Sequence, residues 1–328
     1  MNRRADELVA IGIDLGATKV ETSLVDDAGR VIMSVRHFTH AEKGPEAVIA
    51  GIVESARTCL AATGRKAACI GVGAAGEVDG TSGDIITALN MGWKYVPLKK
   101  MLEKAAGLPV FVINDVRAAA WAEWKYGAGC GVDHLACVFV GTGLGGGVVS
   151  GGRLLEGWGN VAAEIGHMTI VAGGRRCTCG GRGCLEAYAG GWAIAERAQE
   201  AAAADKAAGA GLIAQSGNIK NISAATITQA YLKGDRLAVR LVRSTARYLA
   251  AGLVSIVHVL NPQVIILGGG VIEGLPEYMD MVRTIVISRV LEASSRGLRI
   301  TPAALGNRAG VIGAAGIAAE RMKPKAYC

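Results

Sequence analysis

The sequence is poor in aromatic and charged residues and has no apolar run of membrane length. Aromatic side chains make up 5% and charged side chains 19% of the 328 residues, whereas apolar residues make up 51%. The longest apolar run that resembles a membrane span, "YLAAGLVSIVHVL", is shorter than the roughly 20 residues that a helical span needs, and Asn261-Pro262 follows it. No secretory signal is visible near the amino terminus. We therefore expect a well-buried globular protein of the cytoplasm, without a membrane partner.

The sequence also lacks a continuous basic stretch. Its net charge is +7, from 35 basic and 28 acidic residues, but the basic residues are scattered. This pattern predicts a weak preference for anionic small molecules and no nucleic-acid partner. The length allows two ordinary domains, and 47 glycines are typical of an enzyme with many tight turns around a ligand.

Three of the eight cysteines lie within "CTCGGRGC", ten residues after a histidine. In a reducing compartment, such a cluster favours a metal over disulfides. Cys177, Cys179 and Cys184 with His167 supply three thiolates and one imidazole, the ligand set of a closed tetrahedral structural zinc site. No C-x-x-C spacing occurs among them, which disfavours a redox pair. The dispersed cysteines are predicted to be buried free thiols: Cys59, Cys69, Cys130, Cys137 and Cys328.

Two glutamates, Glu164 and Glu186, flank this cluster. If one nitrogen of His167 binds zinc, its other N–H can donate a hydrogen bond outward. The two carboxylates and the imidazole could then hold the hydroxyls of a sugar. The alternative is that both glutamates are solvated or orient the metal ligands.

Two turns with a shared order, strand, Gly/Thr turn and strand, lie about 125 residues apart. The first is "DLGATK", residues 14–19, and the second is "GTGLGGG", residues 141–147, after a strand at Leu135 to Val140 and before one at Val148-Val149. Two glycines suffice for a hairpin turn, so the extra glycines predict close approach of a ligand. A third glycine run, Gly268 to Gly270, follows a buried strand and precedes a helix.

The repetition favours two related domains that clamp one nucleotide. Asp14 at the end of a strand could hold a hydrated Mg²⁺, and Thr18 adds a hydroxyl donor. Neither the dinucleotide fingerprint nor the Walker loop fits these turns. The alternative for the first turn is an ordinary glycine-containing hairpin.

Asn114 and Asp115 stand where a strand, Val110 to Ile113, meets a helix. Asp115 could cap that helix, or it could act as a general base toward a bound hydroxyl. Asn114 could hydrogen-bond the same ligand. Upstream, Gly76, Glu77 and Asn90 lie in a polar, glycine-rich region that suits a polyhydroxy ligand, although surface loops are polar in any case.

In this order, "DLGATK", "GAAGEVD", "INDVRAAAWAE", "VFVGTGLGGGVV", "GNVAAEIGHM", "CTCGGRGCLE" and "LNPQVIILGGGV" resemble the ROK family of bacterial sugar kinases and repressors over about residues 8–320. The cysteine segment matches the family signature CxCGxxGCxE. The resemblance implies an α/β, actin-like ATPase (ribonuclease H-like) fold with two lobes and a cleft between them. Residues 1–115 and a returning C-terminal helix, about 306–322, would form the smaller lobe. Residues 116–305 would form the larger lobe, with the zinc site and the surface of a homodimer or homotetramer.

The resemblance further implies ATP, Mg²⁺ and structural zinc, with Asp115 as the base that activates a hexose hydroxyl. Glucose is the favoured sugar, and N-acetylmannosamine, N-acetylglucosamine and fructose are alternatives. The implied sugar contacts are Gly76, Glu77, Asn90, Asn114, Asp115, Glu164, His167 and Glu186. The implied nucleotide contacts are Asp14, Gly16, Ala17, Thr18, Lys19, Gly141, Thr142, Gly143, Gly268, Gly269 and Gly270.

The same family contains sugar-sensing repressors, which need a DNA-binding helix-turn-helix. About eight residues precede the first expected strand, so we expect a kinase.

Overall fold

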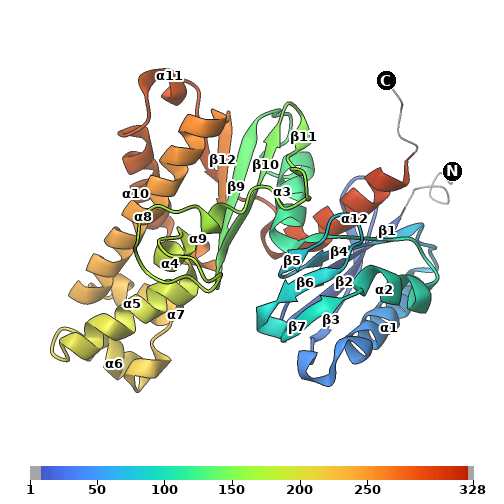
Figure 1. Ribbon diagram of the computed structural model, residues 1–328, viewed down its shortest axis with the longest axis horizontal. Coiled ribbons are helices and arrows are strands. Elements are labelled where there is room, and N and C mark those ends of the chain that lie inside the picture. Colours follow the sequence, from blue (N-terminus) through green and yellow to red (C-terminus); the bar gives the residue numbers. More distant parts are fainter. Residues whose placement is uncertain (1–8, 324–328) are drawn as a thin grey trace.

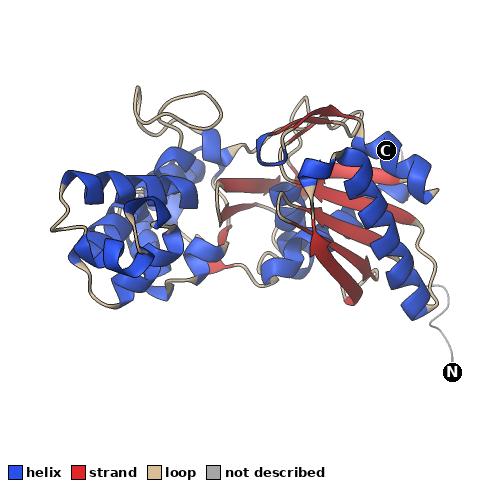
Figure 2. Ribbon diagram, turned by 90° about the horizontal axis from the view of Figure 1, so that it is seen from below, coloured by secondary structure: helices blue, strands red, loops and turns tan. Residues whose placement is uncertain are grey.

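Two five-stranded sheets with the same strand arrangement dominate the structure, a computed structural model that describes residues 9–323 (Figures 1 and 2). The first sheet runs β3 (Val31–Phe38), β2 (Lys19–Val25), β1 (Ala10–Leu15), β4 (Cys69–Ala74) and β8 (Val110–Asn114). The second sheet runs β11 (Arg153–Leu154), β10 (Leu144–Ser150), β9 (Leu135–Val140), β12 (Val264–Gly268) and β13 (Arg299–Pro302).

The strand directions repeat as well as the order. β1 pairs antiparallel with β2 and parallel with β4, and β9 pairs antiparallel with β10 and parallel with β12. The outer strands follow the same rule in both sheets. The two related halves inferred from the glycine-rich turns are therefore confirmed.

The first sheet carries helices on both faces and a small insertion after β4. The insertion is a three-stranded sheet of β5 (Glu77–Val78), β6 (Ile85–Ala88) and β7 (Trp93–Val96), with the short helix η2 (Leu89–Met91). One face is covered by η1 (Ala41–Lys43), α1 (Pro45–Thr63) and α2 (Leu98–Ala106), whose buried side chains join those of the strands in one core. Contacts on the other face come from α3 (Asp115–Tyr126), η5 (Gly306–Arg308) and α12 (Ala309–Met322).

The C-terminal helix α12 lies against β1 and β4, although nearly 300 residues separate it from β1 in the sequence (Figure 1). A Cβ added at Gly12 would lie 2.0 Å from the carbonyl oxygen of Val311, and one at Gly71 would lie 1.8 Å from that of Ala314. These strand positions accept only glycine because the helix backbone rests directly on the sheet.

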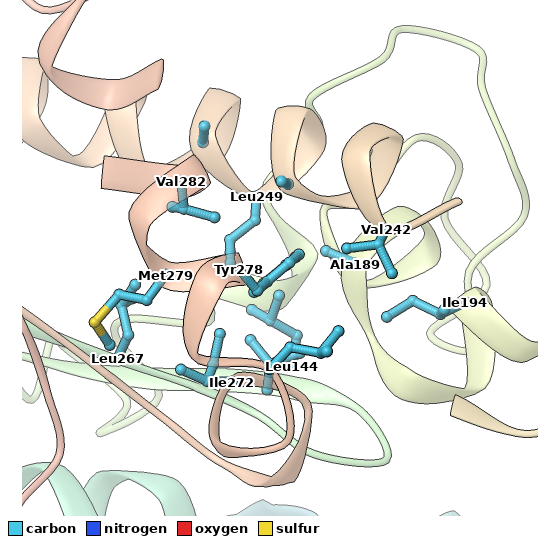
Figure 3. Packing of buried hydrophobic residues seen from close by; sticks show 14 of the residues in the cluster. Leu144, Ala189, Ile194, Val242, Leu249, Leu267, Ile272, Tyr278, Met279 and Val282 are labelled. Carbon is cyan, nitrogen blue, oxygen red and sulfur yellow. The ribbon is translucent and has the colours of Figure 1, made fainter. Parts of the chain in front are cut away.

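The second sheet packs against a larger group of helices. They are η3 (Ile165–His167), α4 (Glu186–Ala189), α5 (Gly191–Ala204), α6 (Ala210–Ser216), η4 (Ile219–Asn221), α7 (Ala224–Leu232), α8 (Arg236–Leu260), α9 (Gly270–Glu273), α10 (Pro276–Ile287) and α11 (Glu292–Ser295). Figure 3 shows Tyr278 of α10 packed among Leu249, Val282 and Leu144 in their shared core. Burial raises the pKa of the Tyr278 hydroxyl. Among residues 9–323, no helix is long and apolar enough to cross a membrane.

One expectation about the glycines is wrong. β10 begins at Leu144 and not at Val148, so Gly145, Gly146 and Gly147 lie inside a strand. A Cβ at Gly145 would lie 2.7 Å from the Val116 side chain. One at Gly147 would lie 2.5 Å from the Cβ of Ala120. These glycines allow α3 to pack closely on β10, so helix packing explains them without a ligand.

The dispersed cysteines follow the sequence prediction in part. Cys59, Cys69 and Cys137 are buried free thiols, as expected. Cys130 is exposed, because it lies in the turn that follows α3. Cys328 lies outside the described residues.

A buried carboxylate, Glu123, joins the two segments by which the chain passes between the sheets. Glu123 is fully buried on α3, which leads from β8 toward β9. Its oxygens accept hydrogen bonds from the backbone N–H groups of Ala128 at 2.9 Å and of Ala304 and Leu305 at 2.8 to 3.0 Å. Ala304 and Leu305 lie on the return path from β13 to α12. The Glu123 side chain therefore holds together the two segments that connect the sheets.

We predict that Glu123→Gln lowers the free energy of unfolding by about 3 kcal/mol. The amide keeps one acceptor oxygen, but its N–H₂ group would face backbone N–H donors. Urea denaturation would measure the loss, and Glu54→Gln, an exposed glutamate on α1, is the matched control. Equal stability of the Glu123 variant and the wild type would contradict this role.

Candidate active site

The predicted site residues of the first sheet gather at one edge, where its parallel strands end. Asp14 of β1 pairs with Gly73 of β4, and Ala74 of β4 pairs with Asn114 of β8. Carboxyl ends of parallel strands meet at the same edge of a sheet, which is where ligands bind in open α/β folds. Residues separated by 100 positions in the sequence thus become neighbours.

Asn114, and not Asp115, caps α3. The Asn114 side chain accepts a hydrogen bond from the backbone N–H of Arg117 and donates one to the carbonyl of Gly76, each at 3.2 Å. The bond to Gly76 connects two of the predicted sugar-binding residues, Asn114 and Gly76. Asp115 is the first residue of the helix, and its carboxylate accepts the adjacent N–H of Val116 at 2.8 Å. The alternative in which Asp115 serves as the cap is therefore wrong.

Asp14 and Asp115 are both partly buried, and desolvation disfavours the charged form of each. Burial raises the pKa of Asp14 to about 7, and the nearby charges of Asp115 and Glu21 raise it further, while Arg36 opposes them. Burial also raises the pKa of Asp115, although hydrogen bonds to its carboxylate counteract part of the effect. A divalent cation near Asp14 would relieve this repulsion, so the carboxylate pair fits the predicted Mg²⁺.

The first glycine turn, which holds Gly16, Ala17, Thr18 and Lys19, is fixed by a residue that sequence reasoning missed. Thr39 is buried at the end of β3, and its hydroxyl donates to the carbonyl of Gly16 at 2.7 Å. Its backbone N–H donates to the carbonyl of Thr18 at 2.9 Å. The side chains of Thr18 and Lys19 remain exposed. No local signal identifies Thr39, because the contact spans 23 residues.

The second and third glycine turns lie at the corresponding edge of the other sheet. Gly141, Thr142 and Gly143 follow β9, and the backbone N–H groups of Gly191 and Trp192 at the start of α5 donate to the carbonyls of Gly141 and Thr142. Gly268 ends β12, the parallel neighbour of β9. Gly269 has φ +92° and lies against the backbone of Val140, whereas Gly270 is open. Packing alone explains Gly269, and Gly270 is free to face a ligand.

The four predicted metal ligands form one cluster. One donor atom from each of His167, Cys177, Cys179 and Cys184 lies within 4.8 Å of the others. The Sγ atoms of Cys179 and Cys184 are 3.7 Å apart, and Cys177 Sγ is 3.7 Å from His167 Nδ1. A disulfide needs about 2.05 Å between sulfurs. Zinc at about 2.3 Å from each sulfur places two sulfurs roughly 3.8 Å apart in a tetrahedron. The donor set therefore fits tetrahedral zinc.

Glu186 connects the metal-ligand segment to the second glycine turn. It is only 9% exposed, and its Oε2 accepts the backbone N–H of Leu144 at 2.8 Å. Its Oε1 accepts the hydroxyl of Thr178 at 3.3 Å and the indole N–H of Trp192 at 3.1 Å. Both oxygens are thus used inside the protein, so Glu186 positions its neighbours, and its predicted sugar contact depends on a remaining acceptor site.

Glu164 belongs to the second half of the chain but is influenced by charges from the first. Burial raises its pKa, Glu77 and Asp115 add to that effect, and His167 and Arg117 lower the pKa. Glu77 and Asp115 of the first half therefore act electrostatically on Glu164 of the second half. Asn90 is exposed at η2 and makes no hydrogen bond within residues 9–323, so its predicted role has no contact to support it.

Comparisons with known proteins agree with this architecture. Residues 10–321 match the sequence profile of the ROK family. The glucokinase of Streptomyces coelicolor is 36% identical over 317 residues, which cover 95% of this chain and 98% of that protein. The N-acetylmannosamine kinase of Escherichia fergusonii is 32% identical, with 94% and 97% covered.

A solved structure shows the same fold. The ROK family glucokinase from Streptomyces griseus, crystallised with glucose and AMPPNP, is 36% identical, with a TM-score of 0.80 over 95% of this chain and 99% of that one. The expected α/β, actin-like fold with two lobes is confirmed.

We predict that Asp14→Asn stabilises the protein at pH 8 but not at pH 4. The folded carboxyl keeps its proton to about pH 7, whereas the unfolded one loses it near pH 4, so wild-type stability falls as the pH rises between these values. Removing the ionisable group avoids that loss, about 2 to 4 kcal/mol at roughly 1.4 kcal/mol per pKa unit. Urea denaturation without added Mg²⁺ would measure it, with exposed Asp27→Asn as control. A pH-independent difference would contradict the assignment.

Proposed function

Because the chain belongs to the ROK family, we propose that it is an ATP-dependent sugar kinase that transfers the terminal phosphoryl group of ATP to glucose, forming glucose 6-phosphate. The observation that carries this function is the pair of partly buried carboxylates, Asp14 and Asp115, at the strand edge beside the glycine turns. Glucose and AMPPNP in the similar structure from Streptomyces griseus support both substrates.

Asp115 is the general base of the proposed reaction. It removes the proton from the attacking hydroxyl, and a raised pKa makes its carboxylate a better proton acceptor near neutral pH. Asn114 holds the start of α3 through its cap and its bond to Gly76, which fixes the direction in which Asp115 projects.

The nucleotide lies along the glycine turns in this proposal. Gly16, Ala17, Thr18 and Lys19 from the first half and Gly141, Thr142 and Gly143 from the second hold the β- and γ-phosphates, and Gly268, Gly269 and Gly270 lie against the adenosine. Asp14 holds Mg²⁺, which when bound neutralises charge on the transferred phosphoryl group. Thr39 and the start of α5 keep the two phosphate turns in place.

The sugar contacts come from both halves of the chain. From the first half come Gly76, Glu77, Asn90, Asn114 and Asp115. Glu164, His167 and Glu186 come from the second. The effect of Glu77 and Asp115 on the pKa of Glu164 supports this grouping. The proposed lobes are residues 1–115 with the helix at 306–322, and residues 116–305, which carry a homodimer or homotetramer surface; the packing of α12 on the first sheet supports the division.

Zinc is the proposed structural metal, bound by His167, Cys177, Cys179 and Cys184. It holds the segment in which Thr178 donates to Glu186, and Glu186 in turn holds the second phosphate turn. His167 presents its other ring N–H to the sugar.

N-acetylmannosamine is the strongest alternative sugar, because a kinase for it is 32% identical to this chain. N-acetylglucosamine and fructose remain the other candidates. A coupled assay of ADP release with glucose, N-acetylmannosamine, N-acetylglucosamine, fructose and mannose would rank these sugars by kcat/KM. Sugar binding without ADP release in every case would favour a sugar-sensing regulator and contradict the proposal.

Asp115→Asn should lower kcat for glucose by about 10²- to 10⁴-fold, because the amide cannot take the proton. Glucose binding, measured by calorimetry, should change only a few-fold, since the amide is isosteric. Asp133→Asn, at a surface turn before β9, is the control. Undiminished turnover in the Asp115 variant would remove the base from this mechanism.

Cys179→Ser should lose zinc and lower the melting temperature by at least ~5 °C, because a bound structural metal contributes several kcal/mol to local order. Its matched control is Cys130→Ser, since both cysteines are exposed and only Cys179 lies in the cluster. Elemental analysis and thermal unfolding measure the two effects. Wild-type protein that contains no zinc would rule out the metal assignment.

A further inference from the structure

Arg117 is a buried cation close to the proposed base. It lies on α3, two residues after Asp115, and is only 2% exposed. Its Nη1 donates to the carbonyl of Asn160, and its Nη2 donates to the carbonyl of Leu155 at 3.2 Å. Both carbonyls belong to residues 155–164, the segment that joins β11 to η3. The structure therefore connects the helix that carries Asp115 to this segment.

The 155–164 segment has little regular structure of its own. Gly157, Asn160 and Ala163 all adopt left-handed conformations, with φ of +70°, +58° and +67°. The segment is closed internally by the bond from the N–H of Ala162 to the carbonyl of Glu156. Such a segment depends on outside contacts for its position, and it ends at Glu164, a proposed sugar contact.

Asn160 also brings the segment against the first half of the chain. A Cβ added at Gly80 would lie 2.0 Å from the Asn160 Cβ, so the two residues touch. Gly80 follows β5, the strand that begins with Glu77. The Asn160 carbonyl that accepts from Arg117 thus belongs to a residue that contacts Gly80, close in sequence to the proposed sugar contact Glu77.

Stability alone does not account for an arginine at this position. Within residues 9–323, Arg117 has no ion pair, and its Nε is buried without a partner. Burial lowers its pKa, while the charges of Glu156 and Glu164 favour the protonated form. An apolar side chain of similar volume would avoid the cost of desolvating the guanidinium. The planar guanidinium group of Arg117 has several N–H donors and is suited to holding two carbonyl oxygens at once.

We propose that Arg117 is a positioning residue for the sugar: by holding the carbonyls of Leu155 and Asn160, it sets the place of Glu164 relative to Asp115. This inference rests on the proposed sugar contact of Glu164. Asp115 and Arg117 are two residues apart on one rigid helix, so the two hydrogen bonds fix the separation between the base and the segment that ends at Glu164. A small displacement of bound substrate costs much of the rate.

Arg117→Met tests the inference because it removes both hydrogen bonds and the charge while nearly keeping the volume. We expect kcat/KM for glucose to fall by about 100-fold, mainly through KM, while KM for ATP stays within about twofold. Arg117→Lys keeps the charge and one donor group, and should recover about tenfold of the loss.

The matched control is Arg321→Met. Arg321 pairs with Glu156 of the same segment at 2.8 Å, but this ion pair is solvent-exposed. Its loss should change kcat/KM less than about twofold. Equal losses in kcat/KM for Arg117→Met and Arg321→Met, or an equal rise in both KM values for Arg117→Met, would overturn the positioning role. If Arg117→Met does not fold, the same comparison is made with Arg117→Lys.

A double-mutant cycle with Glu164→Gln decides whether Arg117 acts through Glu164. If it does, the double variant should be within about threefold of the worse single variant in kcat/KM for glucose. Fully multiplicative losses would overturn the inference and leave the sugar contact of Glu164 intact. A wild-type glucose KM for Glu164→Gln alone would overturn both the sugar contact and the inference, which separates the two failures.

Discussion

The partial burial of two carboxylates at one sheet edge is the constraint on which the site depends. Asp14 lies on β1 and Asp115 begins α3 directly after β8, with β4 between these two strands, and the charge of Asp115 disfavours that of Asp14. The fold tolerates this repulsion because the strands around the two carboxylates are buried and are held by α12, which packs on Gly12 and Gly71. In the proposed function, this repulsion favours a bound cation at Asp14, and the raised pKa of Asp115 favours proton transfer from a hydroxyl.

The second half of the chain supplies the complementary part of the site through a chain of short contacts. The cluster of His167 and three cysteines holds the segment around Thr178, and Thr178 donates to Glu186. Glu186 then accepts the backbone N–H of Leu144, next to the second glycine turn. The loop that carries the candidate metal ligands and the second glycine turn, more than 30 residues apart in the sequence, are thereby fixed together.

Repetition of one sheet pattern in both halves shows how similar elements acquire different uses. Both halves have a glycine turn after the first strand, but only β1 carries an acidic residue, Asp14, in its last two positions. In the second half, Gly145 and Gly147 lie against Val116 and Ala120 of α3. The abundant glycines therefore have two explanations in this chain. Some are proposed to leave the backbone open to a ligand, and others let a helix pack closely on a strand.

The sequence by itself determined the features whose chemistry is local. The spacing of Cys177, Cys179 and Cys184 indicated the metal cluster, and the strand and turn pattern around Asp14 indicated one of the two halves, because these signals span only a few residues. Tertiary structure alone decided that Asn114 is the helix cap, that Thr39 holds the first turn, and that Glu123 and Arg117 join distant segments. Apart from the cap itself and the Ala128 N–H that Glu123 accepts, their partners lie 23 to 182 residues away and depend on how whole elements pack. No local pattern encodes such partners, because only the packed fold brings their donors and acceptors within bonding distance.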